Sequence, residues 1–346
     1  MKRTTIVDVA RRAGTSTAVV SYVLNPGSKP VSDGLRVRVL QAVAELDYRP
    51  HRHARDLRRR SDWGQLGVLI PDLTLPFYAT LAASIEAEAR RRRQLVLTGN
   101  TGFEVGVERE LARSFVDAGV DSLLVAGVCD GRAVAQLCRD GRVPLIWVHH
   151  NRNADGPHAV CSDHVRAGVL AAQHLIDTHR RASIAFVGGF TDEHVLHGDR
   201  DTVRERFEGY REVVGAAVRH IATDLTLDSA YRAVRGDIRA NGAPDGLIVG
   251  TFFQAAPVLR ALADAGLRVP ADVPVVGFDA DARNKYGLIT LTAVQQDVDE
   301  LARRAISSAG SPQHSPAPAT TSPRVPVRLV PAESCGCVTQ FGGRIH

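Results

Sequence analysis

The stretch TIVDVARRAGTSTAVVSYVLN, residues 5–25, decides the fold of the N-terminal region. Thr5 and Asp8 have the spacing of a helix-capping box, and apolar residues then recur at helical spacing until Gly14. Ser16 stands where it can cap a second helix. Two short helices joined by a turn that contains glycine are typical of a helix-turn-helix. We therefore predict this motif at the start of the chain.

The following segment, VSDGLRVRVLQAVAELDYRPH at residues 31–51, predicts a third helix. Ser32 can cap this helix, and Pro50 ends the helical unit. We expect apolar residues at helical spacing on its buried side, namely Leu35, Val39, Leu40, Val43 and Leu46. A three-helix bundle with an incidental positive face is the alternative to a DNA-reading unit.

Charge is distributed unevenly along the chain of 346 residues, whose formal net charge is +5. Residues 1–60 hold 13 basic and 5 acidic side chains, whereas the remainder holds 30 basic and 33 acidic ones. A basic head on a slightly acidic body indicates a domain that binds a polyanion. Composition alone leaves nucleic acid, an anionic membrane and an unstructured basic arm open.

Several classes of protein are excluded by composition. No run approaches the about 20 apolar residues of a membrane span. Asp8, Arg11 and Arg12 stand where a signal peptide needs its apolar stretch, so we expect a cytosolic protein. Five cysteines in so long a chain do not suggest a disulfide framework.

The body of the chain alternates between strand-like apolar runs and amphipathic helical segments from Leu66 onward. One such series runs over residues 66–149 and a second over residues 164–278. This rhythm predicts parallel β-sheets covered by helices, arranged as two lobes. The proline-rich residues 312–326 predict an extended surface excursion.

The N-terminal sequence resembles the LacI/GalR (lactose-repressor) family of bacterial transcription regulators. The resemblance is carried by residues 5–25 and 31–51 and continues through ARDLR at residues 54–58. It implies a sequence-specific, ligand-responsive repressor that binds a pseudo-palindromic double-stranded DNA operator as a homodimer. The chain has no leucine heptads near its end, so we expect a dimer and not a tetramer.

By this resemblance, the second helix reads DNA. The positions that face base edges are Thr17, Ala18 and Tyr22, and the positions that contact phosphates are Thr5, Ser16, Ser21 and Asn25. Methyl groups of Thr17 and Ala18 suit the thymine methyl group, and these positions hold no arginine or glutamine for bidentate base recognition. Val19 and Tyr22 depart from the usual residues, so the operator sequence does not transfer from a relative.

Residues 51–60, HRHARDLRRR, resemble the hinge helix of the same family. So short a helix is marginal alone, and the resemblance implies that it folds in the minor groove with Leu57 wedged into the central base step. His51, Ala54 and Arg58 would make the accompanying contacts. A solvated basic linker is the alternative.

The remaining residues resemble the two-lobed periplasmic sugar-binding fold that this family carries as its effector domain. The resemblance follows the order IPDLTLPFY, DSLLVAG, DHVRAGVLAAQHL, RERFEGYREVV and GFDAD. The expected organisation is a helix-turn-helix at 1–50, a hinge helix at 51–60 and an effector and dimerisation domain at 61–346. Its N-lobe would comprise residues 65–163 and 293–310, and its C-lobe residues 164–292 and 324–346.

The same resemblance implies a ligand site between the lobes, where strand ends and helix N-termini meet. Arg206 suits hydroxyls or a carboxylate, and Asp279 suits a hydroxyl. The full set of expected ligand-binding residues is Leu75, Phe77, His149, Arg200, Thr202, Arg206, Thr251, Phe252 and Asp279. Surface ion pairs or helix-start positions are the alternative for individual members, above all Arg200 and Thr202.

This expected site departs from the family pattern. His149 stands where an aspartate is frequent, Thr251 and Phe252 replace an Asn-Asp pair, and Leu225 replaces an aromatic residue. Buried sugar hydroxyls need polar partners, so these losses make a simple hexose a poor fit. We expect a less polar or aromatic effector, or none.

Other chemistry finds little support in the sequence. No HExxH, paired CxxC, GxGxxG or Walker pattern occurs, so we expect no metal and no cofactor. Cys335-Gly-Cys337 could bind a metal or respond to redox conditions, although two free thiols are the favoured interpretation. A cytosolic small-molecule-binding protein and an α/β enzyme are the alternative functions.

Overall fold

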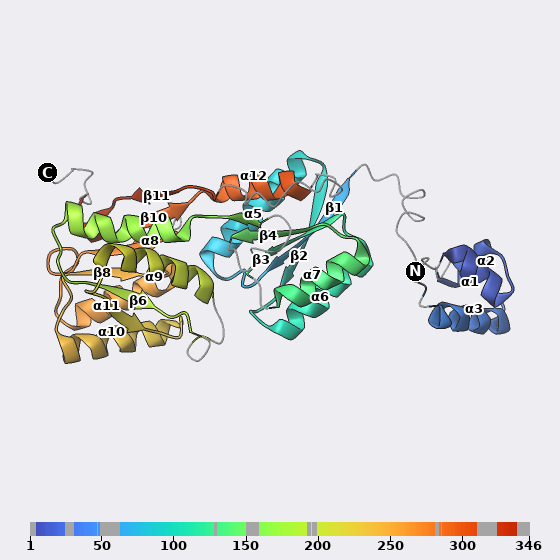
Figure 1. Ribbon diagram of the computed structural model, residues 1–346, viewed down its shortest axis with the longest axis horizontal. Helices are drawn as coiled ribbons and strands as arrows, with labels where there is room; N and C mark the ends of the chain where they lie inside the picture. The colour runs from blue at the N-terminus through green and yellow to red at the C-terminus, as the bar shows by residue number, and fades with distance from the viewer. Residues whose placement is uncertain are drawn as a thin grey trace. The chain divides into compact units, whose positions relative to one another are not determined.

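The computed structural model describes residues 5–24, 31–46, 48, 63–127, 130–149, 159–191, 195, 199–280, 284, 286–309 and 324–337 (Figure 1). It divides into two compact units, Met1–Asp62 and Trp63–His346. The expected DNA contacts Asn25, His51, Ala54, Leu57 and Arg58 lie outside the described residues, as do the hinge segment and most of the proline-rich segment. No helix of the described parts is long and apolar enough to cross a membrane.

The first unit contains helices α1 (Ile6–Ala13), α2 (Thr17–Leu24) and α3 (Asp33–Glu45). The predicted capping box is confirmed, because Thr5 accepts a bond from the Asp8 amide while Asp8 accepts one from the Thr5 amide. Gly14 ends α1 in the left-handed conformation with φ 63°. The predicted stop at this glycine is therefore confirmed.

The expected buried side of α3 is only partly right. Val39 and Ala42 are buried, whereas the Leu40 side chain is 49% exposed. Leu40 lies one residue, or about 100° of helix rotation, beyond Val39 and so faces away from α1 and α2. Ser32 stands at the N-cap but makes no side-chain capping bond.

The second unit contains a five-stranded sheet in the order β2-β1-β3-β4-β5. Its strands are β1 (Gly64–Ile70), β2 (Gln94–Asn100), β3 (Ser122–Ala126), β4 (Leu145–His149) and β5 (Ala159–Cys161). All its neighbouring strands are parallel. One face packs against α5 (Pro76–Arg91) and α12 (Val298–Ala309), and the other against α6 (Val105–Ala118) and α7 (Gly131–Gly141).

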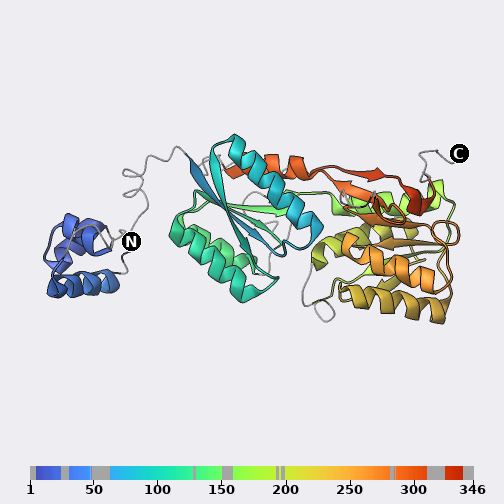
Figure 2. The same cartoon turned by 180° about the vertical axis from the view of Figure 1, so that it is seen from behind.

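A six-stranded sheet in the order β11-β10-β9-β8-β6-β7 forms the second lobe of this unit (Figure 2). Its strands are β6 (Ile184–Gly188), β7 (Arg219–Ala222), β8 (Gly246–Val249), β9 (Val275–Phe278), β10 (Thr292–Gln296) and β11 (Val327–Val330). All pairs are parallel except β10 with β11. The predicted two-lobed α/β architecture with parallel sheets is confirmed.

Helices cover both faces of this sheet. One face packs against α8 (His164–Gln173) and α9 (Arg200–Val214), and the other against α10 (Leu227–Asn241) and α11 (Ala255–Asp264). Helices α8 and α9 touch at two glycines, since a Cβ on Gly168 would lie 1.9 Å from the Arg206 carbonyl oxygen and one on Gly209 1.9 Å from that of Val165. The backbones of the two helices are therefore in direct contact.

The chain passes between the lobes more than once. It leaves the first sheet after β5, and a bridge between Ser162 and Val325 joins two of the crossing segments. The return to the first lobe comes later than the expected residue 293, because β10 is paired within the second sheet. The helix that packs on the first sheet begins at Val298.

Candidate functional site

The helix expected to read DNA, α2, has one buried apolar face and one solvent-exposed face. Thr17 and Ala18 at its start are exposed, and Ser21 and Tyr22 are partly exposed. Val20 and Val23 on the other side are buried. The Ser16 hydroxyl accepts a bond from the Val19 amide at 3.3 Å, so the predicted cap is confirmed. The expected base-facing residues thus share a solvent-accessible surface.

The expected phosphate contact at Thr5 has a competing partner. Its hydroxyl donates to Asp8 Oδ2 at 2.6 Å, and its amide donates to the same oxygen at 2.9 Å. A hydroxyl has one hydrogen to donate, and a phosphate oxygen only accepts. A contact between Thr5 and a phosphate therefore requires the bond to Asp8 to be exchanged.

A cleft of about 740 Å³ lies between the lobes of the second unit. Its walls include residues that end or follow strands of both sheets, the first turn of α5 and the first two turns of α9. The lining includes eight of the nine residues expected to bind a ligand, namely Leu75, Phe77, His149, Thr202, Arg206, Thr251, Phe252 and Asp279. The carboxyl ends of parallel strands are the usual position of ligand sites in such folds.

Arg206 and Asp279 form a buried ion pair in this cleft. Arg206 is 3% exposed, its Nη2 contacts Asp279 Oδ2 at 2.5 Å, and its Nη1 donates to the Gly250 carbonyl oxygen at 2.9 Å. The guanidinium carbon lies 4.3 Å from the centre of the Phe278 ring. Among the described residues, Arg206 Nε is buried without a hydrogen-bond partner. This pair provides both a donor and an acceptor for a ligand.

Asp199 connects the two lobes across the cleft. Its Oδ2 accepts bonds from the Tyr78 hydroxyl at 2.9 Å and the Thr202 hydroxyl at 2.7 Å, and lies 2.8 Å from His149 Nε2. Its Oδ1 accepts from the Thr202 amide at 3.2 Å and so caps α9. Tyr78 and His149 belong to the first lobe, so one carboxylate joins both lobes.

His149 is positioned by its surroundings on several sides. The side chain is 2% exposed, and its Nδ1 lies 3.1 Å from Gln296 Oε1 at the crossing between the lobes. Its ring centre lies 4.2 Å from that of Phe77. His164 Nε2 is 3.0 Å from the His149 carbonyl oxygen. The carboxylate of Asp199 thus approaches His149 from the opposite wall of the cleft.

Left-handed backbone conformations recur around the cleft. His149, Leu225 and Asp279 have φ angles of 85°, 67° and 54°. A side chain with a Cβ is strained in this region, and such strain is concentrated at functional sites. His149 ends β4, Leu225 lies in the loop after β7, and Asp279 directly follows β9; all three line the cleft. These strained backbone conformations direct the three side chains toward the cleft.

Arg200 is the one expected ligand residue that does not line the cleft. Its Nη1 donates to the Val195 carbonyl oxygen at 3.4 Å. Arg200 is the first residue of α9, and its side chain contacts the loop that precedes the helix. Thr202 does line the cleft, although its hydroxyl is already donated to Asp199.

The histidine at the start of α8 is held in its neutral form. Burial, together with the positive charge of Arg206, keeps the pKa of His164 well below its usual value. Its side chain is fully buried. A neutral imidazole here lets the buried guanidinium of Arg206 face Asp279 without a competing charge from position 164.

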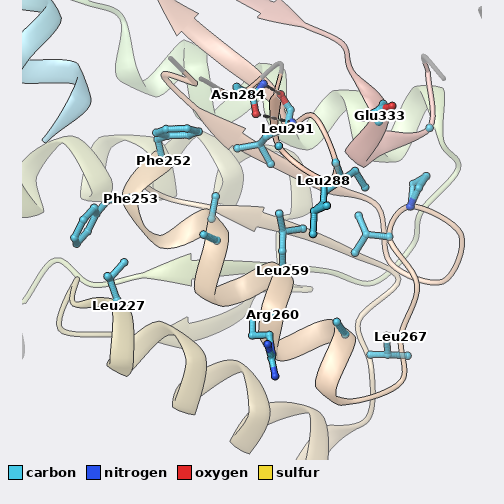
Figure 3. Close-up of a pocket in the computed structure, with 18 of the residues that line it drawn as sticks. Leu227, Phe252, Phe253, Leu259, Arg260, Leu267, Asn284, Leu288, Leu291 and Glu333 are labelled. Carbon is cyan, nitrogen blue, oxygen red and sulfur yellow. Dashed lines mark hydrogen bonds between the residues drawn. The ribbon is translucent and has the colours of Figure 1, made fainter. Parts of the chain in front are cut away.

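A second pocket of about 1010 Å³ adjoins the cleft on the second lobe (Figure 3). Its lining is largely apolar and includes Leu227, Phe252, Phe253, Leu259, Leu267 and Leu288. Phe252 lines both the cleft and this pocket. Leu288 is 99% exposed and Phe253 is 41% exposed, so the pocket opens onto an apolar surface.

Comparison with known proteins places these features in a family. Residues 5–51 match the model of bacterial regulatory proteins of the lacI family, and residues 172–335 match that of a periplasmic binding protein-like domain. Catabolite control protein A of Priestia megaterium is 31% identical over 313 residues, covering 88% of this chain and 91% of the relative. The chain belongs to the LacI family. It is a DNA-binding transcription regulator.

Solved structures agree with this LacI-family fold. The lac repressor dimer bound to operator and the anti-inducer ONPF has a TM-score of 0.66 at 22% identity, covering 96% of this chain and 99% of that chain. The transcriptional regulator CelR in complex with cellobiose has a TM-score of 0.63 at 26% identity, covering 96% and 100%. Both support a helical head followed by a two-lobed effector domain.

Sequence reasoning missed the residues that connect the lobes. Asp199, Tyr78 and Gln296 were not expected at the site, yet all contact His149 or its partners. Asp199 directly precedes the expected residue Arg200, and Tyr78 directly follows the expected residue Phe77. Their position next to expected residues is the one feature of the sequence that could have pointed to them.

Proposed function

We propose that this LacI-family regulator represses transcription by binding a pseudo-palindromic operator as a dimer, and that a compound in the cleft controls this binding. The contact of Asp199 with both lobes supports the control by a ligand. A ligand that replaces these contacts changes how the lobes are held. The ligand must prefer one arrangement, and a hundredfold preference corresponds to about 2.7 kcal/mol.

The proposed base readers are Thr17, Ala18 and Tyr22, with Thr5, Ser16, Ser21 and Asn25 on the phosphates. In the hinge segment, Leu57 would enter the minor groove, accompanied by His51, Ala54 and Arg58. Five arginines in residues 51–60 would then neutralise phosphates. Release of counterions makes such binding strongly dependent on salt. Since bacterial DNA lies in the cytoplasm, we place the regulator there.

The proposed dimer is supported by the apolar surface of the second lobe. The lac repressor of the comparison is a dimer on its operator. Phe253, Tyr286 and Leu288 of this chain are 41%, 80% and 99% exposed beside the apolar pocket. Apolar patches of this kind mark interaction surfaces, and most homodimers bury the same patch of both subunits.

The proposed effector has a polar end and an aromatic or otherwise apolar part. Cellobiose is the ligand of the CelR complex. In this chain Arg206 and Asp279 offer polar contacts, whereas Phe77, Phe103 and Phe252 surround the rest of the cleft. Aromatic walls favour a ligand that can stack on them, and buried hydroxyls beyond the reach of polar groups are disfavoured.

Operator binding tests the proposed DNA contacts. Tyr22→Ala should weaken binding to the DNA upstream of the regulator's own gene by about 5- to 150-fold, the effect of one lost base contact of about 1–3 kcal/mol. Fluorescence anisotropy with labelled DNA measures this. The matched control is Val37→Ala, which removes an apolar side chain 57% exposed on α3 and should leave affinity unchanged.

Scrambled DNA of equal length completes this test, with folding of each variant checked by circular dichroism. Equal binding of the upstream and scrambled DNA by the wild-type chain would contradict a sequence-specific regulator. If Tyr22→Ala still preferred the upstream DNA over the scrambled DNA as strongly as the wild type does, the base contact assigned to Tyr22 would be wrong, but the proposed regulator function would stand.

Matched glycosides test the proposed effector class. A phenyl glycoside should bind at least about tenfold more tightly than the methyl glycoside of the same sugar, because the phenyl ring buries apolar area worth about 1.4 kcal/mol or more. Calorimetry measures both affinities, and Asp279→Ala should weaken both. Micromolar binding of a simple hexose that is abolished by Asp279→Ala would overturn the proposed preference.

A further inference from the structure

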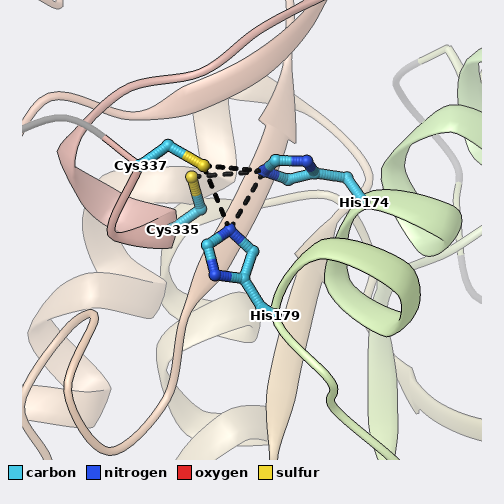
Figure 4. Close-up of side chains that lie close together, drawn as sticks. All are labelled: His174, His179, Cys335 and Cys337. Carbon is cyan, nitrogen blue, oxygen red and sulfur yellow. Dashed lines mark hydrogen bonds between the residues drawn. The ribbon is translucent and has the colours of Figure 1, made fainter. Parts of the chain in front are cut away.

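Two histidines and two cysteines far apart in the sequence meet at the end of the second lobe (Figure 4). They are His174, His179, Cys335 and Cys337, and their four ligand atoms all lie within 4.8 Å of one another. The histidines extend from the end of α8, and the cysteines extend toward them from the C-terminal segment. None of the four lines the ligand cleft.

An unusual helical turn brings the two histidines together. Residues His174–Thr178 form the π-helical turn η1 directly after α8. The His179 amide donates to the His174 carbonyl oxygen at 3.4 Å, so residues five apart complete one turn. The two ring centres are consequently 4.8 Å apart. In a regular α-helix, residues five apart point in different directions.

The two cysteines are placed by a tight turn with its own hydrogen bonds. Cys335 ends the short 3₁₀ turn η4 (Glu333–Cys335). Gly336 follows with φ 92°, a conformation that favours glycine and turns the chain back so that Cys337 also faces the histidines. The Ser334 hydroxyl donates to the Val275 carbonyl oxygen at 2.6 Å. Bonds independent of the thiols therefore hold this turn.

Four of the six distances between ligand atoms are close to those of a tetrahedral site, and the other two are no more than 4.8 Å. The two Nε2 atoms are 3.2 Å apart, and the nitrogen–sulfur distances are 3.3 Å for His174 with Cys335, 3.7 Å for His174 with Cys337 and 3.3 Å for His179 with Cys337. Tetrahedral zinc with bonds of about 2.05 Å to nitrogen and 2.3 Å to sulfur requires about 3.3 Å between nitrogens and about 3.6 Å between nitrogen and sulfur.

Hydrogen bonding alone does not account for this arrangement. The Nε2 atom of His174 lies close to His179 Nε2, Cys335 Sγ and Cys337 Sγ at once. An imidazole nitrogen has either one hydrogen or one lone pair in the ring plane, so it makes one good bond. A single ion between the four atoms gives every one of them a partner.

The charges of such a complex suit its burial. His174 is 8% exposed and Cys335 is 2% exposed. Two thiolates and two neutral imidazoles balance the charge of a divalent cation, so the buried complex is neutral overall.

We propose that His174, His179, Cys335 and Cys337 bind one zinc ion, which fastens the C-terminal segment to the end of α8. Two sulfur and two nitrogen ligands in tetrahedral arrangement are typical of structural zinc. In the structure Cys335 and Cys337 are free of disulfide bonds, and the proposal assigns them the metal-binding role that the sequence left open. It is independent of the proposed operator and effector.

The test measures metal in the full-length chain without an affinity tag, purified under reducing conditions. Elemental analysis by mass spectrometry should find one zinc per chain. After removal of zinc with a chelator, Co²⁺ should give the intense visible bands of four-coordinate cobalt and a thiolate charge-transfer band. Added zinc should raise the melting temperature of the metal-free protein.

Variants separate this site from other zinc binding. Cys337→Ala and His179→Ala each remove one partly exposed ligand and should weaken zinc binding by at least about tenfold, since even a lost outer-shell partner has this effect. Cys138→Ala removes a buried thiol of α7 in the other lobe and should retain one tightly bound zinc. Both ligand variants should lose the zinc-dependent rise in melting temperature.

Three results would overturn the proposal. The first is less than one zinc per reduced wild-type chain when zinc is in excess. The second is equal zinc affinity in Cys337→Ala and the wild type. The third is copper in place of zinc, or a Cys335–Cys337 disulfide that persists in reductant, at the purified site.

Discussion

Replacing Gly168 with alanine is expected to destabilise the second lobe by about 3 kcal/mol or more, because overpacking against a rigid backbone is among the most costly substitutions. The new Cβ would lie 1.9 Å from the Arg206 carbonyl oxygen and 3.0 Å from the Tyr210 amide nitrogen. Backbone atoms cannot move away by a rotamer change as a side chain can, so α8 and α9 must separate. Urea unfolding followed by circular dichroism measures the loss.

The matched control for this prediction is Gly236→Ala. Gly236 lies within α10, and a Cβ there would meet nothing within 4 Å. The same substitution should therefore stabilise the protein by about 0.5–1 kcal/mol through helix propensity. Equal stability of the two variants would show that α8 and α9 do not make the close contact described above.

Arg206→Met is expected to lower the free energy of unfolding by about 3–5 kcal/mol, because it leaves the buried Asp279 carboxylate without its cation. The side chains of this pair are 4% and 10% exposed. Thermal or urea unfolding measures the effect, and ligand binding should be lost with it. The double variant Arg206→Met with Asp279→Leu should recover much of the stability, because neither charge remains.

Arg204→Met is the control on the same helix. Arg204 pairs with Asp201 at 2.8 Å, but its side chain is 51% exposed, so its loss should cost less than about 1 kcal/mol. If Arg204→Met and Arg206→Met destabilised the protein equally, burial of the Arg206 pair would not be the cause.

Local chemistry made the head and the repeating α/β elements predictable from the sequence. Thr5 with Asp8, Gly14 and Ser16 each act within a few residues, and each does in the structure what its spacing predicts. Leu40 was misassigned because helical spacing alone does not show which arc of α3 the other helices cover. The short strands β5, β7 and β11 carry too few residues for a pattern.

Contacts over long sequence distances were beyond local reasoning. Asp199 meets Tyr78 across 121 positions, and His174 meets Cys335 across 161. No spacing rule connects such residues, because their approach depends on how the sheets and helices pack. Arg206 and Asp279 were identified only through family resemblance. The π-helical turn that aligns His174 with His179 likewise has no signal in a pattern with a period of 3.6 residues.

The course of the chain back and forth between the lobes limits where recombination can divide the coding sequence without loss of folding. Helix α12 covers the first sheet although it follows β10 in the sequence, and β11 then completes the second sheet. Each lobe is therefore encoded by separate segments of the gene, and a cut at the crossing near Ser162 would separate the first sheet from the helix α12 that covers it. We therefore expect that the head can be exchanged near Asp62 without loss of folding, whereas the two lobes must be exchanged together.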